Sequence, residues 1–278
     1  MGREVRGGGQ LDEIRLVAVD LDGTLLRSDK TMAPEGVALL LQAVARGVHV
    51  ILATTRNPES ACAIASELGL TGPLICSNGA QVWASPEGPV WATFTLPRHV
   101  GLSLAQLADE RDWELIITVG QETYWRWRPG QSAAPVHTRV TLMDHNVDGV
   151  VGDPLRIMAW QPEAIEPIRL WCADRFPDLC RTAVFYNPDG STECIGVFAP
   201  DAHKGTALTL VAERLGIPLS QVLAVGDQAI DVPMFQAAGV SVAMGNAPPD
   251  VQAAATWVGP CNDEEGVAWA LRRVGAAE

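Results

Sequence analysis

The chain has 278 residues, of which 47% are hydrophobic, which is enough for two domains with a sizeable core. Its formal net charge of −13 argues against nucleic acid as a partner, because a phosphate backbone needs a basic surface. A small phosphorylated molecule is not excluded, since a metal ion or a few local cations can bind it. The six cysteines form no Cys-x-x-Cys pair, and no signal peptide or long apolar run is evident. We therefore expect no structural zinc, no disulfide framework, no membrane partner and a cytoplasmic location.

The first part of the chain alternates buried strands with amphipathic helices. Leu16–Val19 is a short apolar block, typical of a strand that is buried on both faces. Further strands are predicted at 48–53 and 73–76, and Asn57 is expected to cap the helix between them. Pro34 opens another helix, which should bury the apolar residues spaced along one face, namely Val37, Leu40, Leu41 and Val44.

The middle of the chain does not continue the regular alternation of strands and helices, and it is rich in tryptophan. Seven of the nine tryptophans lie between Trp83 and Trp171. Helices are predicted at 98–111 and 162–176, and strands at 115–119, 124–127, 157–160, 182–186 and 192–197. We interpret this stretch as an inserted α+β domain whose aromatic residues pack its sheet rather than form a ligand cage.

The alternation of the first part resumes after the insertion. A helix begins at Lys204, and strands are predicted at 221–225, 240–244 and 255–258, with a helix at 231–238. Asn262, followed by Glu265, is similar to a capping box that starts the last helix. The alternation predicts an α/β fold with a parallel sheet. The predicted parts are a flexible tail at 1–10, a core domain at 11–82 and 196–278, and an inserted domain at 83–195.

Two carboxylates, Asp20 and Asp22, directly follow the first buried strand. Ligands of open α/β sheets bind beyond the carboxyl ends of the strands. One acid could therefore attack or bind a metal while the other transfers a proton. The run also fits a tight turn. A calcium loop would need Glu at its twelfth position, where Thr31 stands.

Other predicted strands also end in polar residues, namely Thr54, Ser77 and Asp227. If the strands are parallel neighbours, these side chains converge with Asp20 at one edge, which Lys204 can reach from the start of its helix. Taken singly, each residue also fits an ordinary role as a cap, a turn or a solvated side chain. Together with Asp22, they supply three carboxylates, hydroxyls and an ammonium.

This set matches the needs of phosphoryl transfer. Asp20 and Asp227 offer hard oxygen ligands to Mg²⁺, whose charge would reduce the repulsion between a carboxylate nucleophile and a phosphate. Lys204 adds a positive charge, and Thr54 with the amides after it can hydrogen-bond phosphate oxygens. Asp22 can protonate the leaving oxygen and then activate water against the aspartyl-phosphate.

These residues resemble the haloacid dehalogenase (HAD) superfamily. Its four motifs are similar, in order, to Asp20-Leu21-Asp22-Gly23-Thr24, Thr54 with Arg56, Lys204-Gly205, and Gly226-Asp227 with Asp231. Two further runs and the long insertion resemble the Cof-type (class IIB) branch with its C2B cap: Ser77-Asn78-Gly79-Ala80 and Met244-Gly245-Asn246-Ala247.

The resemblance implies a Rossmann-like core, an inserted α+β C2B-type cap that moves over the site, Mg²⁺ dependence and an aspartyl-phosphate intermediate. By resemblance, Asp20 is the nucleophile and Asp22 the acid/base. The metal would be held by Asp20, the backbone carbonyl of Asp22, and Asp227, with Asp231 in support. Thr54 and Lys204 complete the catalytic set.

Substrate contacts are expected from Thr55, Arg56 and Asn78 in the core, and substrate choice from the cap. The run 186–190 is a further candidate contact, although an ordinary hairpin turn is the favoured interpretation. Two positions depart from the family pattern. Ile230 stands where the fourth motif has Asn, which removes a polar group near the metal. Thr55 stands where the second motif has Gly, which narrows the phosphate cradle.

The predicted function is Mg²⁺-dependent hydrolysis of a phosphate monoester of a small metabolite, such as a sugar, polyol or cofactor phosphate. A non-catalytic binder of phosphorylated ligands and a phosphomutase on the same core remain as alternatives. No particular oligomeric state is predicted.

Overall fold

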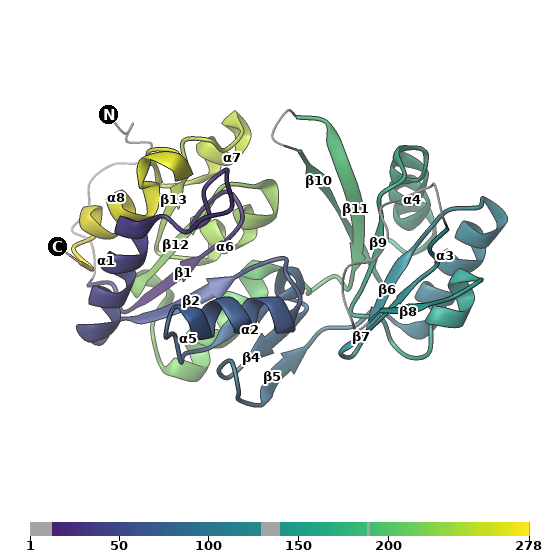
Figure 1. Cartoon of the computed structure of the whole chain (residues 1–278), viewed down its shortest axis with the longest axis horizontal. Helices are drawn as coiled ribbons and strands as arrows, with labels where there is room; N and C mark the ends of the chain where they lie inside the picture. The colour runs from purple at the N-terminus through teal and green to yellow at the C-terminus, as the bar shows by residue number, and fades with distance from the viewer. Residues whose placement is uncertain (1–12, 129–139, 188–189, 278) are drawn as a thin grey trace. The chain divides into compact units, whose positions relative to one another are not determined.

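The computed structural model describes residues 13–128, 140–187 and 190–277, so the predicted tail at 1–10 lies outside it. The chain divides into two compact units (Figure 1). The core unit comprises the described residues up to Ala92 and from His203 onward, and the inserted unit is Thr93–Ala202. The predicted boundaries of the inserted domain, after residues 82 and 195, lie earlier in the sequence than the boundaries of this unit. The reason is that two more strands join the core sheet after residue 80 and the last inserted strand continues to Phe198.

An eight-stranded sheet of described residues forms the centre of the core unit, in the order β14-β13-β12-β1-β2-β3-β4-β5. The strands from β14 to β3 run parallel, which confirms the predicted α/β fold, and β4 is antiparallel to β3. The bounds are β1 Leu16–Val19, β2 His49–Ala53, β3 Leu74–Cys76, β4 Gln81–Trp83, β5 Val90–Thr93, β12 Val222–Gly226, β13 Val240–Ala243 and β14 Trp257–Val258. The hairpin partners β4 and β5 were not predicted.

Helices cover both faces of this sheet, which is why β1 is apolar throughout. Because side chains alternate along a strand, Val17 and Val19 pack with one set of helices, whereas Leu16 and Ala18 pack with the other. The first set is α1 Pro34–Ala45, α2 Pro58–Glu67 and α8 Gly266–Arg273. The second set is α5 Lys204–Leu215, α6 Val232–Ala237 and α7 Pro249–Ala254.

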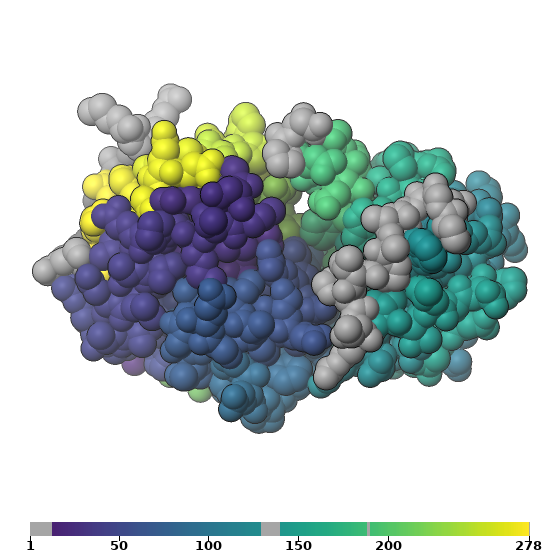
Figure 2. Space-filling view, in the orientation of Figure 1, coloured from purple at the N-terminus to yellow at the C-terminus, as the bar shows by residue number. Residues whose placement is uncertain are grey.

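Helix α1 packs against α8, so segments from opposite ends of the sequence lie side by side (Figure 2). Where the two helices meet, a Cβ on Gly36 would lie 3.3 Å from the Cβ of Val267. The predicted buried face of α1 was wrong for Leu41 and Val44, which are 41% and 42% exposed. Leu39 is buried instead, because the position of α8 decides which face of α1 is covered.

The predicted start signals of two helices had different outcomes. Asn57 caps α2 as predicted, since its Oδ1 accepts a hydrogen bond from the Ser60 amide at 2.9 Å. The predicted capping box at Asn262 was wrong. The Glu265 carboxylate instead accepts a hydrogen bond from the Gly36 amide in the first turn of α1, at 2.9 Å, and α8 begins at Gly266.

The inserted unit is an α+β unit built on a six-stranded sheet of described residues, in the order β10-β11-β9-β6-β7-β8. Two helices, α3 Arg98–Glu110 and α4 Pro162–Arg175, pack with the sheet around one hydrophobic core. The strands are β6 Ile116–Val119, β7 Glu122–Trp125, β8 Val140–Leu142, β9 Arg156–Ala159, β10 Arg181–Tyr186 and β11 Thr192–Phe198. Strand β8 was not predicted. None of the described helices is both long and apolar enough to cross a membrane.

The predicted hairpin turn after Tyr186 is present, because β10 and β11 pair in antiparallel fashion on either side of it. Two residues of the run 186–190, Pro188 and Asp189, lie outside the described part of the chain. Two of the aromatic residues pack as predicted. Trp113 lies in the hydrophobic core of the inserted unit, and Trp171 contacts Phe176 edge-on, with ring centroids 5.3 Å apart.

The turn after β3 touches the start of α5. Gly79 has a φ of +92°, and a Cβ there would lie 2.3 Å from the backbone carbonyl carbon of His203. Gly47 has a similar φ of +87°, but a Cβ there would meet nothing within 4 Å. A side chain at Gly47 would therefore meet only the energetic cost of a left-handed backbone, whereas a side chain at Gly79 would also clash with His203.

Gly47→Ala should therefore cost about 1–2 kcal/mol of stability, because only the left-handed conformation is penalised. Gly79→Ala should lose at least twice as much, because the turn or α5 must also move. Thermal unfolding followed by circular dichroism measures both variants. Equal losses would show that the contact with His203 does not constrain the fold.

Candidate active site

Polar residues that follow three neighbouring strands meet at one edge of the core sheet. Strand β1 pairs in parallel with β2 and β12, so Asp20, Thr54 and Asp227 all lie beyond the carboxyl ends of adjacent strands. The amide of Asp20 continues the ladder by donating to the Val225 carbonyl at 3.0 Å. The strand order reverses direction between β1 and β12, and open α/β sheets bind ligands at such a switch point.

Lys204, the first residue of α5, is fully buried at this edge. Its Nζ donates to Oδ1 of Asp20 and to Oδ1 of Asp231, each at 2.6 Å. Burial lowers the pKa of Lys204, but the charges of the two carboxylates outweigh it and raise the pKa above its ordinary value. The side chain is therefore a charged ammonium inside the protein and not a solvated surface lysine.

Asp227 is held by groups from two other segments. Its Oδ1 accepts a hydrogen bond from Thr24 Oγ1 at 2.9 Å, and Asn246 Nδ2 lies 3.4 Å from its Oδ2. The carboxylate packs directly on Gly23, where a Cβ would lie 2.2 Å from Oδ2. A residue without a side chain is thus required next to Asp227, and Gly23 also adopts a φ of +83°.

The buried acids resist ionisation in the protein without a bound cation. Burial raises the pKa of Asp20 to about 7, although the nearby Lys204 charge lowers it. Burial and the negative charge of Asp20 raise the pKa of Asp227 to about 8. The positive charge of Lys204 alone therefore does not balance the negative charges of the surrounding carboxylates. A further cation at this place would stabilise their charged forms.

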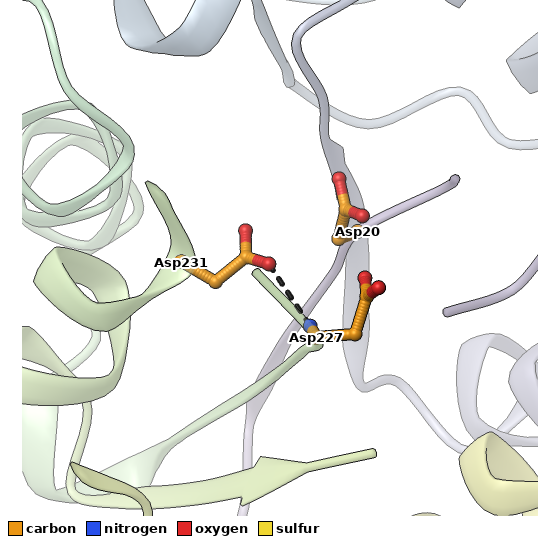
Figure 3. Close-up of side chains that lie close together, drawn as sticks. All are labelled: Asp20, Asp227 and Asp231. Carbon is orange, nitrogen blue, oxygen red and sulfur yellow. Dashed lines mark hydrogen bonds between the residues drawn. The ribbon is translucent and has the colours of Figure 1, made fainter. Parts of the chain in front are cut away.

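The side chains of Asp20, Asp227 and Asp231 point toward one another (Figure 3). Each offers a carboxylate oxygen within 4.8 Å of those of the other two. Hard oxygen donors with surplus negative charge fit a divalent cation such as Mg²⁺. Asp231 is the most constrained of the three, because its Oδ2 accepts hydrogen bonds from the amides of Asp227 and Gln228 at 3.0 and 2.9 Å.

Ile230 lies between these acids in the sequence, on the short turn Ala229–Asp231, and is 9% exposed. The turn is closed by a capping box between Gln228 and Asp231. An apolar residue at position 230 is therefore compatible with the local structure, because hydrogen bonds on either side of it hold the turn.

Asp22 has a different environment from Asp20. Arg56 makes a bidentate contact with it, Nε to Oδ2 and Nη2 to Oδ1, each at 2.8 Å. Lys30 Nζ lies 3.4 Å from Oδ1. The Arg56 hydrogen bonds hold the pKa of Asp22 below its ordinary value despite partial burial. Its carboxylate therefore faces Arg56 in this structure, whereas the Asp20 carboxylate faces Lys204.

The remaining predicted residues lie on the turns after β2 and β3. Thr54 is fully buried and its Oγ1 accepts a hydrogen bond from the Arg56 amide at 3.1 Å, while Thr55 is half-buried. The Asn78 amide donates to the Thr54 carbonyl at 3.0 Å, so the two turns are joined. Ser77 and Asn78 are buried in left-handed conformations, with φ of 52° and 59°. Asn78 thus lies next to Thr54, with its side chain covered.

Sequence reasoning gave no role to two residues that contact Asp227. Thr24 closes the Asp20–Thr24 run, and Asn246 follows β13. The signal that identified Asp20 and Asp227, a buried strand followed by a polar residue, was also present at Val240–Ala243, three residues before Asn246. One glycine separates the predicted strand 240–244 from Asn246, just as Gly226 separates the predicted strand 221–225 from Asp227.

Comparison with known proteins agrees with this geometry. The family model of haloacid dehalogenase-like hydrolases matches residues 17–271. The "HAD subclass IIB sugar phosphatase BT4131" has a similar structure, with a TM-score of 0.81 over 94% of this chain and 99% of that one. At 20% sequence identity, this likeness shows a shared fold.

Two curated relatives are phosphatases by name. The 5-amino-6-(5-phospho-D-ribitylamino)uracil phosphatase YcsE of Bacillus subtilis is 27% identical over 94% of this chain and 95% of its own length. The HMP-PP phosphatase of Serratia proteamaculans is 29% identical over 86% of each chain. With the family match over residues 17–271, they show that the chain belongs to the haloacid dehalogenase-like hydrolases, in their Cof-type phosphatase branch.

Proposed function

We propose that the protein hydrolyses a phosphate monoester of a small metabolite, such as a sugar, polyol or cofactor phosphate, with Mg²⁺ as its cofactor. The observation that carries the proposal is the buried cluster of Asp20, Asp227 and Asp231 around Lys204 at the carboxyl edge of the sheet. An acid at the end of β1 beside a fixed ammonium suits attack on an anionic phosphorus. The two relatives named above act on phosphorylated small molecules, which supports the same substrate class.

Mg²⁺ would be held by the carboxylates of Asp20 and Asp227 and the backbone carbonyl of Asp22. Asp231 would support Asp227, because it already binds the Asp227 amide and Lys204. When bound, the ion supplies positive charge that offsets the repulsion between Asp20 and a phosphate dianion. The fit rests on the donor set, three buried carboxylates with one ammonium between them.

In the proposed reaction, a carboxylate oxygen of Asp20 attacks phosphorus and the ester P–O bond breaks. Asp22 gives its proton to the leaving alkoxide oxygen, so the product is an alcohol and the enzyme carries an aspartyl-phosphate. The Asp22 carboxylate then takes a proton from water, whose oxygen attacks phosphorus. Inorganic phosphate leaves and Asp20 is regenerated.

Arg56 would couple substrate binding to the protonation of Asp22. Its two hydrogen bonds keep the Asp22 pKa low, which suits a base but not an acid. A phosphate group competes well for a guanidinium, because the planar guanidinium can donate two parallel hydrogen bonds to oxygens of the tetrahedral phosphate. Transfer of Arg56 from Asp22 to the substrate phosphate would raise the pKa of Asp22 when its proton is needed. Thr54 and Thr55 would donate to the same phosphate, with Asn78 holding their turn.

We also propose a cytoplasmic location. None of the six cysteines, which lie within the described residues, forms a disulfide, and such a set suits a reducing compartment.

Asp20→Asn should abolish turnover, by at least about 1,000-fold in kcat, because an amide cannot form the phosphoenzyme. The assay is release of inorganic phosphate from p-nitrophenyl phosphate and a panel of sugar, polyol and cofactor phosphates with Mg²⁺. Asp174→Asn, an exposed change in the inserted unit, is the control. Unchanged rates in Asp20→Asn would reject it as the nucleophile. Products that retain phosphate would indicate a mutase, and no turnover by the wild type would indicate a binding protein.

Asp227→Asn should stabilise the protein at pH 8 without Mg²⁺ and remove the stabilisation that Mg²⁺ gives. The pKa of Asp227 is raised from 3.8 to about 8 in the folded chain. At pH 3 both folded and unfolded forms are protonated and the raised pKa costs nothing. As the pH rises from 4 toward 8 the unfolded acid ionises first, so the folded state loses stability. The amide does not titrate and avoids this loss.

Thermal midpoints at pH 4.5 and pH 8, with and without Mg²⁺, test this expectation. At pH 8 without metal the variant should melt several degrees above the wild type, at roughly 2–4 °C per kcal/mol for a chain of this size. Near pH 4.5 the gap should shrink. A lower midpoint than the wild type at pH 8, or an unchanged response to Mg²⁺, would contradict the assignment of Asp227.

A further inference from the structure

We propose that Asn246 is a positioning residue of the metal site, and that it fixes Asp227 and the loop after β1 relative to each other. Its side-chain amide donates to the Gly23 carbonyl at 2.9 Å and lies 3.4 Å from Asp227 Oδ2. Asn246 would not touch substrate or metal. The inference rests on the proposed function, because it assigns a role toward the proposed Mg²⁺ site.

The orientation of the Asn246 amide is set by its other end. Oδ1 accepts a hydrogen bond from the backbone amide of Asn262 at 3.0 Å. The oxygen is therefore directed at Asn262, and the NH₂ group is directed at Gly23 and Asp227. Since the hydrogen bond to the Gly23 carbonyl is the shorter of the two, Asn246 binds the loop more strongly than it binds the Asp227 carboxylate.

A second asparagine ties down the far end of the same loop. Asn262, which is 5% exposed, donates through Nδ2 to the Leu26 carbonyl at 2.9 Å. The loop from Gly23 to Leu26 is therefore held at both ends by hydrogen bonds from residues of the C-terminal segment. This loop carries Thr24, whose hydroxyl donates to Asp227 Oδ1 at 2.9 Å. Asn246 thus acts on Asp227 directly and through the loop that bears Thr24.

Few of the described side chains hold the Asp227 carboxylate in place. Within the described residues, the side-chain hydrogen bonds that Asp227 accepts come from Thr24 and Asn246. Groups that orient a metal-ligating carboxylate affect metal affinity, typically by 10–100-fold.

The test compares Asn246→Ala with Gln252→Ala in the full chain. Gln252 holds the loop that carries Asn246, with Nε2 donating to the carbonyls of Gly245 and Ala247 at 3.1 and 2.9 Å, but the structure gives it no bond to Asp227. Asn246 is exposed, so its truncation leaves no buried cavity. Asn246→Ser repeats the experiment if the alanine variant is not recovered.

Titration calorimetry with Mg²⁺ alone measures affinity without turnover. We expect the dissociation constant for Mg²⁺ to rise about 10-fold in Asn246→Ala and to change less than twofold in Gln252→Ala. The Mg²⁺ concentration for half-maximal p-nitrophenyl phosphate hydrolysis should rise in parallel, while kcat at saturating Mg²⁺ stays within a few-fold of the wild type. The metal-free thermal midpoints of both variants should stay close to that of the wild type.

Two results would overturn the inference. One is wild-type Mg²⁺ affinity in Asn246→Ala, and the other is an equal loss in Gln252→Ala, which would mean that loop integrity alone is at stake. Failure of the proposed function has a different signature, because the wild type itself would then bind no Mg²⁺ or release no phosphate.

Discussion

The buried contact of Lys204 with Asp20 and Asp231 is the interaction on which the rest of the site depends. Asp20 and Lys204 are 184 residues apart in the sequence, and the Lys204 side chain has no exposure to solvent. An isolated buried charge costs several kcal/mol, whereas one that is paired and hydrogen-bonded is tolerated. The end of β1, the start of α5 and the turn after β12 therefore have to come together for any of these residues to be charged in the interior.

The cluster contains three acids and one ammonium, and burial makes two of the acids costly to ionise. Burial raises the pKa values of Asp20 and Asp227 to about 7 and 8, which lowers the stability of the metal-free protein near neutral pH. Such a cost is typical of sites that are built for a ligand rather than for stability. The hydrogen bonds from Thr24 and Asn246 hold Asp227 in place despite this cost.

Two acids that are neighbours in the sequence have opposite environments. Asp20 extends β1 into the interior, where desolvation raises its pKa, whereas Asp22 lies in the following turn, where Arg56 lowers its pKa. Pairs of acids whose environments separate their pKa values often divide catalytic roles between them. In the proposed mechanism, Lys204 orients the nucleophile, and Arg56 decides when the second acid can hold a proton.

The sequence by itself determined the features that depend on neighbours along the chain. Leu16–Val19 is apolar because both faces of the sheet are covered, and Asn57 caps α2 because its side chain reaches an amide three residues on. The existence of buried strands that end in polar residues, and the resemblance to the family, followed from the same local patterns. The tertiary structure decided which distant group each polar side chain meets. Glu265 binds the start of α1 instead of capping α8, and Asn246 reaches Gly23. Such partners depend on distances between segments that are remote in the sequence, and no local periodicity encodes those distances.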